Sequence, residues 1–433
     1  MSGYRELCSR LSERLPFLPG HGIKWMAERR NNAMTTHFER DFNTPQSDEW
    51  GLSTTIGRRL ERSEHVEISA EWLDRYRVPG ALCLVFVDGV FRPEYSTCEP
   101  VPADVTLKTL QQLDAEQMTT VSLWMSTHPP AEHHPMLNWN TIWMQDGVRL
   151  VVPAHTRLDA PVQILCFGAT SGVLIPLRHF ICLGLCDEAT LIETHVGLEG
   201  CASVTSVHSE LDLDDNASLH HYSLQVESPL ARSFLSLNCI NGRHARFHQH
   251  HLALGGAKAC AEVQVQALRG SECELNGVFY VDGSRHTEIR TRVEHTEPSS
   301  HSGQNYRGMA SDKAKGVFDG IIKVAAHAQK ITANMQNRNL LLSPNAVIDS
   351  RPQLEISADD VRCSHGVTVG QLDADAVFFL MARGLTETEA RTMLSFAFAY
   401  EIIEKIPQGD YRQIARDALI NALPPSDLHQ EWL

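Results

Sequence analysis

The chain has 433 residues, of which 42% are hydrophobic and 21% are charged, a composition typical of globular proteins with a large core. Its formal net charge of -15 repels phosphate backbones and anionic lipids, so neither nucleic acid nor a membrane surface is expected as a partner. The count of 11 cysteines is odd and includes no CxxC pair, which predicts reduced thiols rather than a disulfide framework. No secretory signal or membrane-spanning run is evident, and we expect a cytoplasmic protein.

Residues 1–136 are predicted to form an N-terminal region that is largely helical. The stretch from Met1 to about Arg77 is rich in Arg and Glu at helical spacing and ends at the turn signal VPG. The next segment, ALCLVFVDGVFRPEYS, predicts two strands around an Asp-Gly turn, and therefore a hairpin near residues 80–95. A polar helical stretch follows, through about Met125.

Residues 137–372 change in character to short β segments separated by turn residues. In HTEIRTRVEH, Thr287, Ile289, Thr291 and Val293 alternate with charged residues, as expected of a half-buried strand. The segments ATLIETH, ASLHHYS and ARFHQHH begin at 28-residue intervals, and CELNGVFY continues the step. A repeat of this length predicts a stacked β-solenoid; a large β-sandwich with accidental spacing is the alternative.

Residues 373–433 are predicted to form a C-terminal helical domain. Asp373 is predicted to be an N-cap and Gly384 stands where the first helix ends, while Thr386 and Glu389 form a capping-box pattern at the start of a second helix. The second helix carries two apolar stripes, so it needs two packing surfaces. One is the body of the protein; the second is either another part of the chain or a partner.

Twenty-two histidines raise the question of a metal site. The segment GRHARFHQHH opens like the cupin metal motif, but Leu254 and Gly255 occupy the positions where that motif requires glutamate. Strand alternation places His248 and His250 on one face and His251 on the other, and we interpret them as a polar strand surface. The chain also lacks a Walker phosphate-binding loop and a GxGxxG turn after a strand, so it is not predicted to hydrolyse ATP or to hold a dinucleotide, and it has no GxSxG elbow.

Cys363 and His365 form the remaining candidate site. In a strand, residues i and i+2 face the same way, roughly 6.5 to 7 Å apart, so a thiol and an imidazole could meet one ion or cluster. Two ligands do not close a metal site, which needs about four. The alternative is a buried cysteine beside a hydrogen-bonded histidine, and spacing alone favours it.

The same residues carry a family resemblance. The segment from Gln329 to Gly384, with VRCSHGVTVG at its centre, resembles the C-terminal signature of the SufB/SufD family of iron-sulfur cluster assembly components, and RHFICLGLCDEATLIETHVG and LNWNTIWMQDG resemble the family's core. Within the family the SufD branch is the better match, because SufB has Glu-His-Glu-Ala-Thr where this chain has Cys363 to Thr368.

The resemblance implies a mainly β fold, a right-handed parallel β-helix flanked by helical domains. It also implies that the chain is not an enzyme but a non-catalytic scaffold subunit of a SufBCD complex. It implies pairing with SufB, with His365 and less certainly Cys363 at the shared cluster-assembly interface, and a homodimer when the chain is alone. It also implies that the C-terminal helices bind the SufC ATPase, with Met393, Phe396, Tyr400 and Ile403 as candidate contacts.

The resemblance implies no cofactor held tightly by the lone chain. A transient iron-sulfur cluster or iron is expected in the complex, with a role in iron acquisition, and a reduced flavin is a further candidate there. Two other classes of protein are the alternatives. A β-helix carbohydrate enzyme needs a carboxylate cluster along one face, which is not evident, and a stand-alone metal-binding protein would hold metal stoichiometrically.

Overall fold

The computed structural model describes residues 15, 18, 23–36, 66–127 and 135–424. Most of the predicted helical stretch 1–77 and the end of the C-terminal domain, 425–433, lie outside the described residues. Within the first stretch the structure has α2 (Lys24–Thr36) and α5 (Ala70–Tyr76). Among the described residues, no helix is long and apolar enough to cross a membrane.

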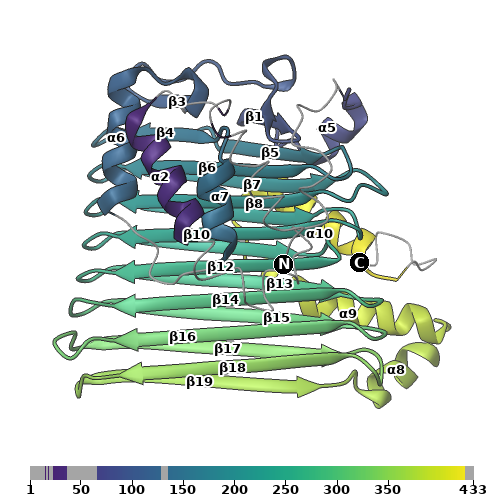
Figure 1. The fold of residues 1–433 in the computed structure, drawn as a ribbon. Helices are drawn as coiled ribbons and strands as arrows, with labels where there is room; N and C mark the ends of the chain where they lie inside the picture. Colours follow the sequence, from purple (N-terminus) through teal and green to yellow (C-terminus); the bar gives the residue numbers. More distant parts are fainter. Residues whose placement is uncertain (1–14, 16–17, 19–22, 37–65, 128–134, 425–433) are drawn as a thin grey trace.

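Two β-sheets, which we call sheet A and sheet B, run the length of the molecule (Figure 1). From β4 onward the chain alternates between them, and every strand pairs in parallel with the strand two places along the sequence. This is the predicted mainly β solenoid with flanking helices, and the β-sandwich alternative is wrong. Sheet A contains β1 (Leu82–Val87), β2 (Val90–Phe91), β5 (Val162–Gly168), β7 (Glu188–Gly197), β9 (Ser218–Val226), β11 (Arg246–Ala253), β13 (Glu272–Val281), β15 (His301–Ala310), β17 (Ile331–Leu341) and β19 (Val361–Gly370). Sheet B contains β3 (Thr106–Thr109), β4 (Val148–Val152), β6 (Leu174–Leu183), β8 (Val204–Leu213), β10 (Arg232–Asn241), β12 (Lys258–Ala267), β14 (His286–His295), β16 (Lys315–Val324) and β18 (Val347–Ile356).

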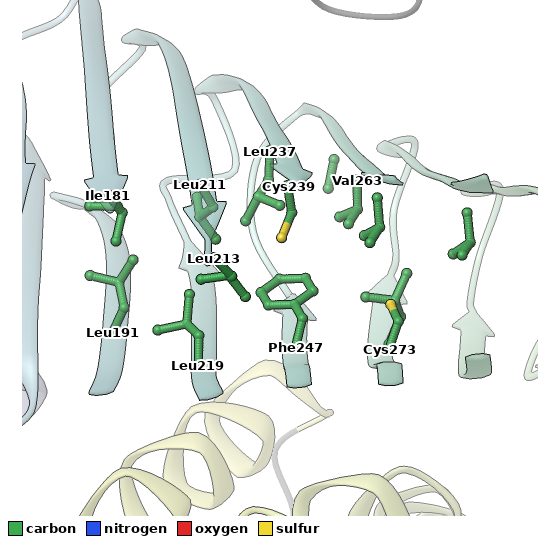
Figure 2. Close-up of a cluster of buried hydrophobic side chains, with 14 of the residues drawn as sticks. Ile181, Leu191, Leu211, Leu213, Leu219, Leu237, Cys239, Phe247, Val263 and Cys273 are labelled. Atoms are coloured by element: carbon green, nitrogen blue, oxygen red, sulfur yellow. The ribbon is translucent and has the colours of Figure 1, made fainter. Parts of the chain in front are cut away.

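The core lies in the space between the two sheets, which we call the lumen. Because side chains alternate along a strand, every second residue points into the lumen. Leu219, Phe247 and Cys273 occupy one register position on consecutive strands of sheet A. Leu211 and Cys239 lie across from them on sheet B (Figure 2), and all five are buried. Each coil therefore buries its apolar face on its neighbours, as a solenoid requires.

The predicted 28-residue step is close to the spacing of the turns but does not hold for each of them. Along sheet A the pairs Ala189↔Leu219, Leu219↔Phe247 and Phe247↔Cys273 are separated by 30, 28 and 26 residues. The connections between strands differ in length, while the strands themselves stay in register. Ala217, which the sequence repeat aligns with Ala189, therefore lies in the turn before β9.

The predicted hairpin forms β1 and β2, which pair antiparallel around a two-residue turn. Asp88 and Gly89 have φ values of 49° and 77°, the left-handed conformation that such a turn requires. Strand β1 also pairs in parallel with β5, and β3 pairs with β4. The sheets thus extend N-terminal to the predicted core of residues 137–372.

Helices cover one end of sheet B. Helices α2, α6 (Ala115–Thr127) and α7 (Pro135–Trp143) lie over it near the N-terminal end of the solenoid (Figure 1), and the short helices η3 (Pro93–Tyr95) and η4 (Leu110–Gln112) connect the first strands. Asn140 of α7 donates to the carbonyls of Leu177 and Ser206, at 2.9 and 2.7 Å. Arg178 of β6 donates to the buried Glu210 at 2.7 Å and to Thr141 at 3.0 Å. Polar contacts thus fix α7 on sheet B.

At the C-terminus, α8 (Ala374–Met381) packs against α9 (Glu387–Ile403), and α9 and α10 (Gly409–Ala422) turn back over the outer face of sheet A. The predicted caps are confirmed: Asp373 accepts from the backbone amides of Asp375 and Ala376, and Thr386 forms the capping box with Glu389. Gly384 has a φ of 100°, which ends the first helical segment. Tyr411 of α10 stacks on Tyr222 of β9, with ring centroids 5.0 Å apart.

The capping box gives a test of how α9 is held. Replacing Thr386 with alanine should lower the free energy of unfolding by about 1 kcal/mol, because the amide of Glu389 loses its acceptor at the helix N-terminus. Urea denaturation measures the loss, and Thr386→Ser, which keeps the hydroxyl, is the matched control. An equal loss in both variants would contradict a role for the cap.

Candidate functional site

The C-terminal end of the solenoid is open. Among the residues that the structure describes, β19 pairs only with β17 and β18 only with β16, so sheets A and B both end in a free edge at the same end of the molecule (Figure 1). Both edge strands are 10 residues long. Long free edges present unpaired backbone N–H and C=O groups and are templates for pairing with another chain.

Cys363 and His365 lie on β19, at this open end. They pair in register with Ala333 and Met335, two buried lumen residues of β17, so both belong to the lumen-facing row, as their spacing predicted. Cys363 is half-buried against the core, and His365 is exposed. Burial raises the pKa of the Cys363 thiol, which therefore stays protonated at neutral pH.

Apolar side chains surround the pair. Val367 and Val369 continue the same row and are 38% and 46% exposed, and Ile356 at the end of β18 is 38% exposed. These residues occupy positions that are covered in every inner coil by the next strand. The open end therefore presents an incomplete core with a thiol and an imidazole at its margin.

Within the described residues, no three His, Cys, Asp or Glu side chains are grouped so that they could hold a metal ion. Cys363 and His365 are only two ligands, and a stable site for iron or a cluster needs more. The arrangement is that of a partial site, to which another chain or a small molecule would have to add ligands.

The histidines of β11 lie on the two faces of the strand as alternation predicted, but they do not form a solvent-exposed surface. His251 points into the lumen, whereas His248 and His250 are on the outer face of sheet A. His250 is only 4% exposed and lies between Tyr222 and the C-terminal helices. The solvent-facing interpretation of these histidines is therefore wrong for His250, because α9 and α10 cover this part of the sheet.

The structure separates the four candidate partner contacts on α9. Phe396 and Ile403 are buried in the cluster that joins α9 and α10 to sheet A. Met393 and Tyr400 are partly exposed. The large exposed apolar residues lie instead on α8, where Phe378 is 70%, Phe379 55% and Met381 41% exposed. Sequence reasoning did not single out these α8 residues, although the run VFFLM in a short helix was a signal.

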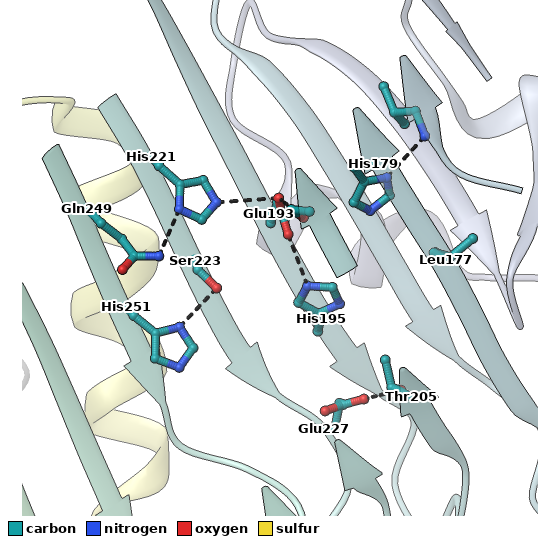
Figure 3. A network of polar contacts seen from close by, with 12 residues as sticks. Leu177, His179, Glu193, His195, Thr205, His221, Ser223, Glu227, Gln249 and His251 are labelled. Atoms are coloured by element: carbon teal, nitrogen blue, oxygen red, sulfur yellow. Dashed lines mark hydrogen bonds and ion pairs between the residues drawn. The ribbon is translucent and has the colours of Figure 1, made fainter. Parts of the chain in front are cut away.

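The sequence also did not predict a polar cluster that lies inside the lumen. Glu193 of β7 accepts from Ser209 at 2.8 Å and lies 3.4 Å from His221 and 3.8 Å from His195 (Figure 3). All four side chains are buried. The segments LIETH and LHHYS contain the glutamate and the two histidines, but the sequence alone does not tell which of two neighbouring histidines faces inward.

The fold and its open end define a class of protein: a parallel β-solenoid with docked terminal helices and an unfinished end suited to assembly with another chain. Two family models match the chain. The SufBD core domain of the SUF system of FeS cluster assembly matches residues 167–398, and the SufBD protein N-terminal region matches residues 78–164. The chain belongs to the SufBD family, whose role is in iron-sulfur cluster assembly.

Individual relatives agree with this assignment. The iron-sulfur cluster assembly protein SufD of Escherichia coli is 36% identical over 238 residues, which cover 54% of this chain and 56% of that protein. A SufBD family protein of Synechocystis is 28% identical over 345 residues, 76% of each chain. A SufBD family protein of Mycobacterium tuberculosis is 33% identical over 273 residues, 61% of this chain and 68% of that protein.

Proposed function

We propose that this chain is a non-catalytic scaffold subunit that pairs end to end with a SufB-type subunit and provides part of a transient cluster-assembly site. The observation that carries the proposal is the open end of the solenoid. Two free strand edges and an incomplete apolar core meet there, and Cys363 and His365 face the same side. A partner with a similar open end would continue both sheets, cover the exposed valines and add the missing ligands.

The metal chemistry of the pair favours a shared, transient site. An exposed imidazole is accessible as a ligand for iron, whereas a protonated thiol is a poor ligand, so His365 is the principal ligand from this chain and Cys363 the secondary one. With so few ligands, the nascent cluster or its iron is cargo that passes through the site, and in this role the chain assists iron acquisition. No bond-making step is assigned to its own residues.

We assign binding of the SufC ATPase to the C-terminal helices. The cluster that holds α9 and α10 on sheet A uses Phe396 and Ile403, so those residues are structural. Helix α8 instead presents two phenylalanines and a methionine to solvent. Exposed aromatic and methionine residues gathered on one helix are typical of a protein–protein contact. Met393 and Tyr400, partly exposed on α9, extend the same contact.

The proposal is tested by co-expressing this chain with the SufB and SufC of its own source, followed by affinity purification through a tag on this chain and mass determination. We expect a complex containing all three chains, and the lone chain should hold no stoichiometric metal. Tight metal in the lone chain, or a lone chain that never captures SufB, would contradict the shared-site model.

The free edge gives a sharper test. Replacing Val367 with aspartate places a charge in the row that a partner must cover, so capture of SufB should fall by about tenfold or more because the charge would be buried on pairing. Folding should be spared, since the side chain is exposed. Thr368→Asp, one residue away on the outward face, is the matched control and should retain binding. Equal losses in the two variants would indicate a general charge effect.

A further inference from the structure

The outer face of sheet A carries a row of polar side chains beside the C-terminal helices. His220 of β9, His248 of β11 and Glu274 of β13 occupy one register position on three consecutive strands. Their neighbours along each strand point into the lumen, so all three side chains are directed outward. Each of them is half-buried. We call these three residues the outer triad.

The two imidazoles of the outer triad lie close together. The ring centroids of His220 and His248 are 5.2 Å apart, and the ring planes are inclined by 39°. Neighbouring strands lie about 4.8 Å apart, so two outward histidines at one register position reach the same region of the surface. Bonds from zinc to histidine nitrogen are about 2.0 to 2.1 Å long, so one ion can bridge two rings at this separation.

Hydrogen bonds within the protein do not use these rings. Nδ1 of His220 is buried and has no hydrogen-bond partner among the described residues, and His248 has none there either. Burial lowers the pKa of both imidazoles, so each ring is neutral at pH 7 and keeps a lone pair on one nitrogen. Neutral imidazole is the form of histidine that binds a metal ion.

Glu274 adds a carboxylate without a partner. It forms no hydrogen bond or ion pair with any other residue that the structure describes, and burial raises its pKa. The carboxylate lies over Gly303 of β15, where a Cβ atom would collide with both of its oxygens. A half-buried carboxylate without a hydrogen bond or a counter-ion is costly, so this position favours a cation.

The nearby cations of the protein do not fill that place. Arg246 of β11 lies at the preceding outward position and pairs in register with Glu272, one outward position before Glu274. Lys405, just after α9, is close enough to lower the pKa of Glu274 but forms no ion pair with it. His250, the next outward residue on β11, is 4% exposed and lies beneath the helices, so it is the inner margin of the site.

One side chain of the outer triad has to turn before all three can meet one ion. With its carboxylate over Gly303, Glu274 leaves only the two imidazoles close together, which agrees with the lack of any group of three metal-binding side chains among the described residues. The glutamate side chain has several rotatable bonds and is held by no hydrogen bond, so a change of rotamer can bring its carboxylate toward the neighbouring His248.

We propose that the outer triad is a weak, exchangeable site for a divalent transition-metal ion such as Zn²⁺, with water completing the coordination. Two imidazoles and one carboxylate are a donor set that zinc accepts while keeping a water ligand. Because the site is open to solvent and one ligand has to turn, the ion is lost on purification, and the lone chain still holds no stoichiometric metal. The inference is independent of the partners assigned above, since Cys363 and His365 lie at the far edge of sheet A.

The test titrates Zn²⁺ into the full chain and measures binding by isothermal titration calorimetry at about pH 7.5, where the imidazoles are neutral. A background variant, Cys363→Ala/His365→Ala, removes the ligands at the open end. In this background His220→Ala or His248→Ala should weaken binding of Zn²⁺ by about tenfold or more, because each removes one ligand. His327→Ala, at an exposed turn histidine, is the matched control and should bind as the background does.

Two further measurements separate binding from folding. Zn²⁺ should raise the Tm of the background variant, because it binds only the folded chain, and should not raise the Tm of His248→Ala. If His248→Ala does not fold, His248→Gln gives the same comparison with a larger polar side chain. Glu274→Gln, which keeps the shape of the side chain, should also weaken binding, and unchanged affinity would remove the carboxylate from the site.

Equal affinity for Zn²⁺ in His248→Ala and His327→Ala, or no binding to the background variant, would overturn the site. Anomalous scattering from crystals soaked in Zn²⁺ should place the ion between the imidazoles of His220 and His248, and an ion found only elsewhere would also overturn it. In the otherwise wild-type chain, His220→Ala/His248→Ala should leave capture of SufB and the cluster yield unchanged. Failure of this site is therefore distinguishable from failure of the shared site at the open end.

Discussion

Replacement of His365 with alanine is expected to abolish cluster formation in the complex while sparing the fold and the pairing with SufB. The imidazole is exposed at the open end, so its removal leaves no cavity. It is the better metal ligand of the pair, because the neighbouring thiol is half-buried and protonated. Acid-labile sulfide and iron, measured per purified complex, should fall by more than about tenfold.

Controls for His365 lie in the same strand. Ser364 points to the opposite face, where it donates to Asn334 at 3.2 Å, and Ser364→Ala should leave the cluster yield unchanged. Cys363→Ala should lower the yield less than His365→Ala does, because the thiol is the weaker ligand. An unchanged yield in His365→Ala would contradict the assignment, and loss of SufB binding would show that the residue contributes to pairing instead.

Local chemistry made several features of this fold predictable from sequence. Asp373, Thr386 and Glu389 define the helix starts because capping depends on a few neighbouring residues. The alternation in β14 and the stepped repeat predicted a solenoid because each coil must bury one face on the next. The same-face placement of Cys363 and His365 followed from strand geometry alone.

Features that depend on tertiary packing were not predictable in the same way. Periodicity gave α9 two apolar stripes but could not tell which one the body of the protein covers, so Phe396 was expected to be a partner contact although it is buried. In the run from His220 to Tyr222, alternation allowed either histidine to face inward. Only the register with β7 brings His221 beside Glu193.

The second substitution with a large expected effect lies on α8 and concerns the binding of SufC. Phe378→Asp should release the SufC ATPase from the complex, because the substitution places a charge at the centre of the exposed apolar surface of this helix. The side chain is 70% exposed, so the fold should survive. Co-purification of SufC with tagged variants measures the effect, which we expect to be a loss of about tenfold or more in the bound fraction.

An aspartate at Phe396 is expected to have a different effect. That ring stacks with Tyr400 at 5.1 Å within the cluster that holds α9 on sheet A, so Phe396→Asp should destabilise the C-terminal domain as well as release SufC. Leu230→Asp, an equally apolar and 56% exposed position in the turn after β9, is the matched control and should retain SufC. If SufC still follows Phe378→Asp, the ATPase binds elsewhere, and the partly exposed Met393 and Tyr400 become the next positions to test.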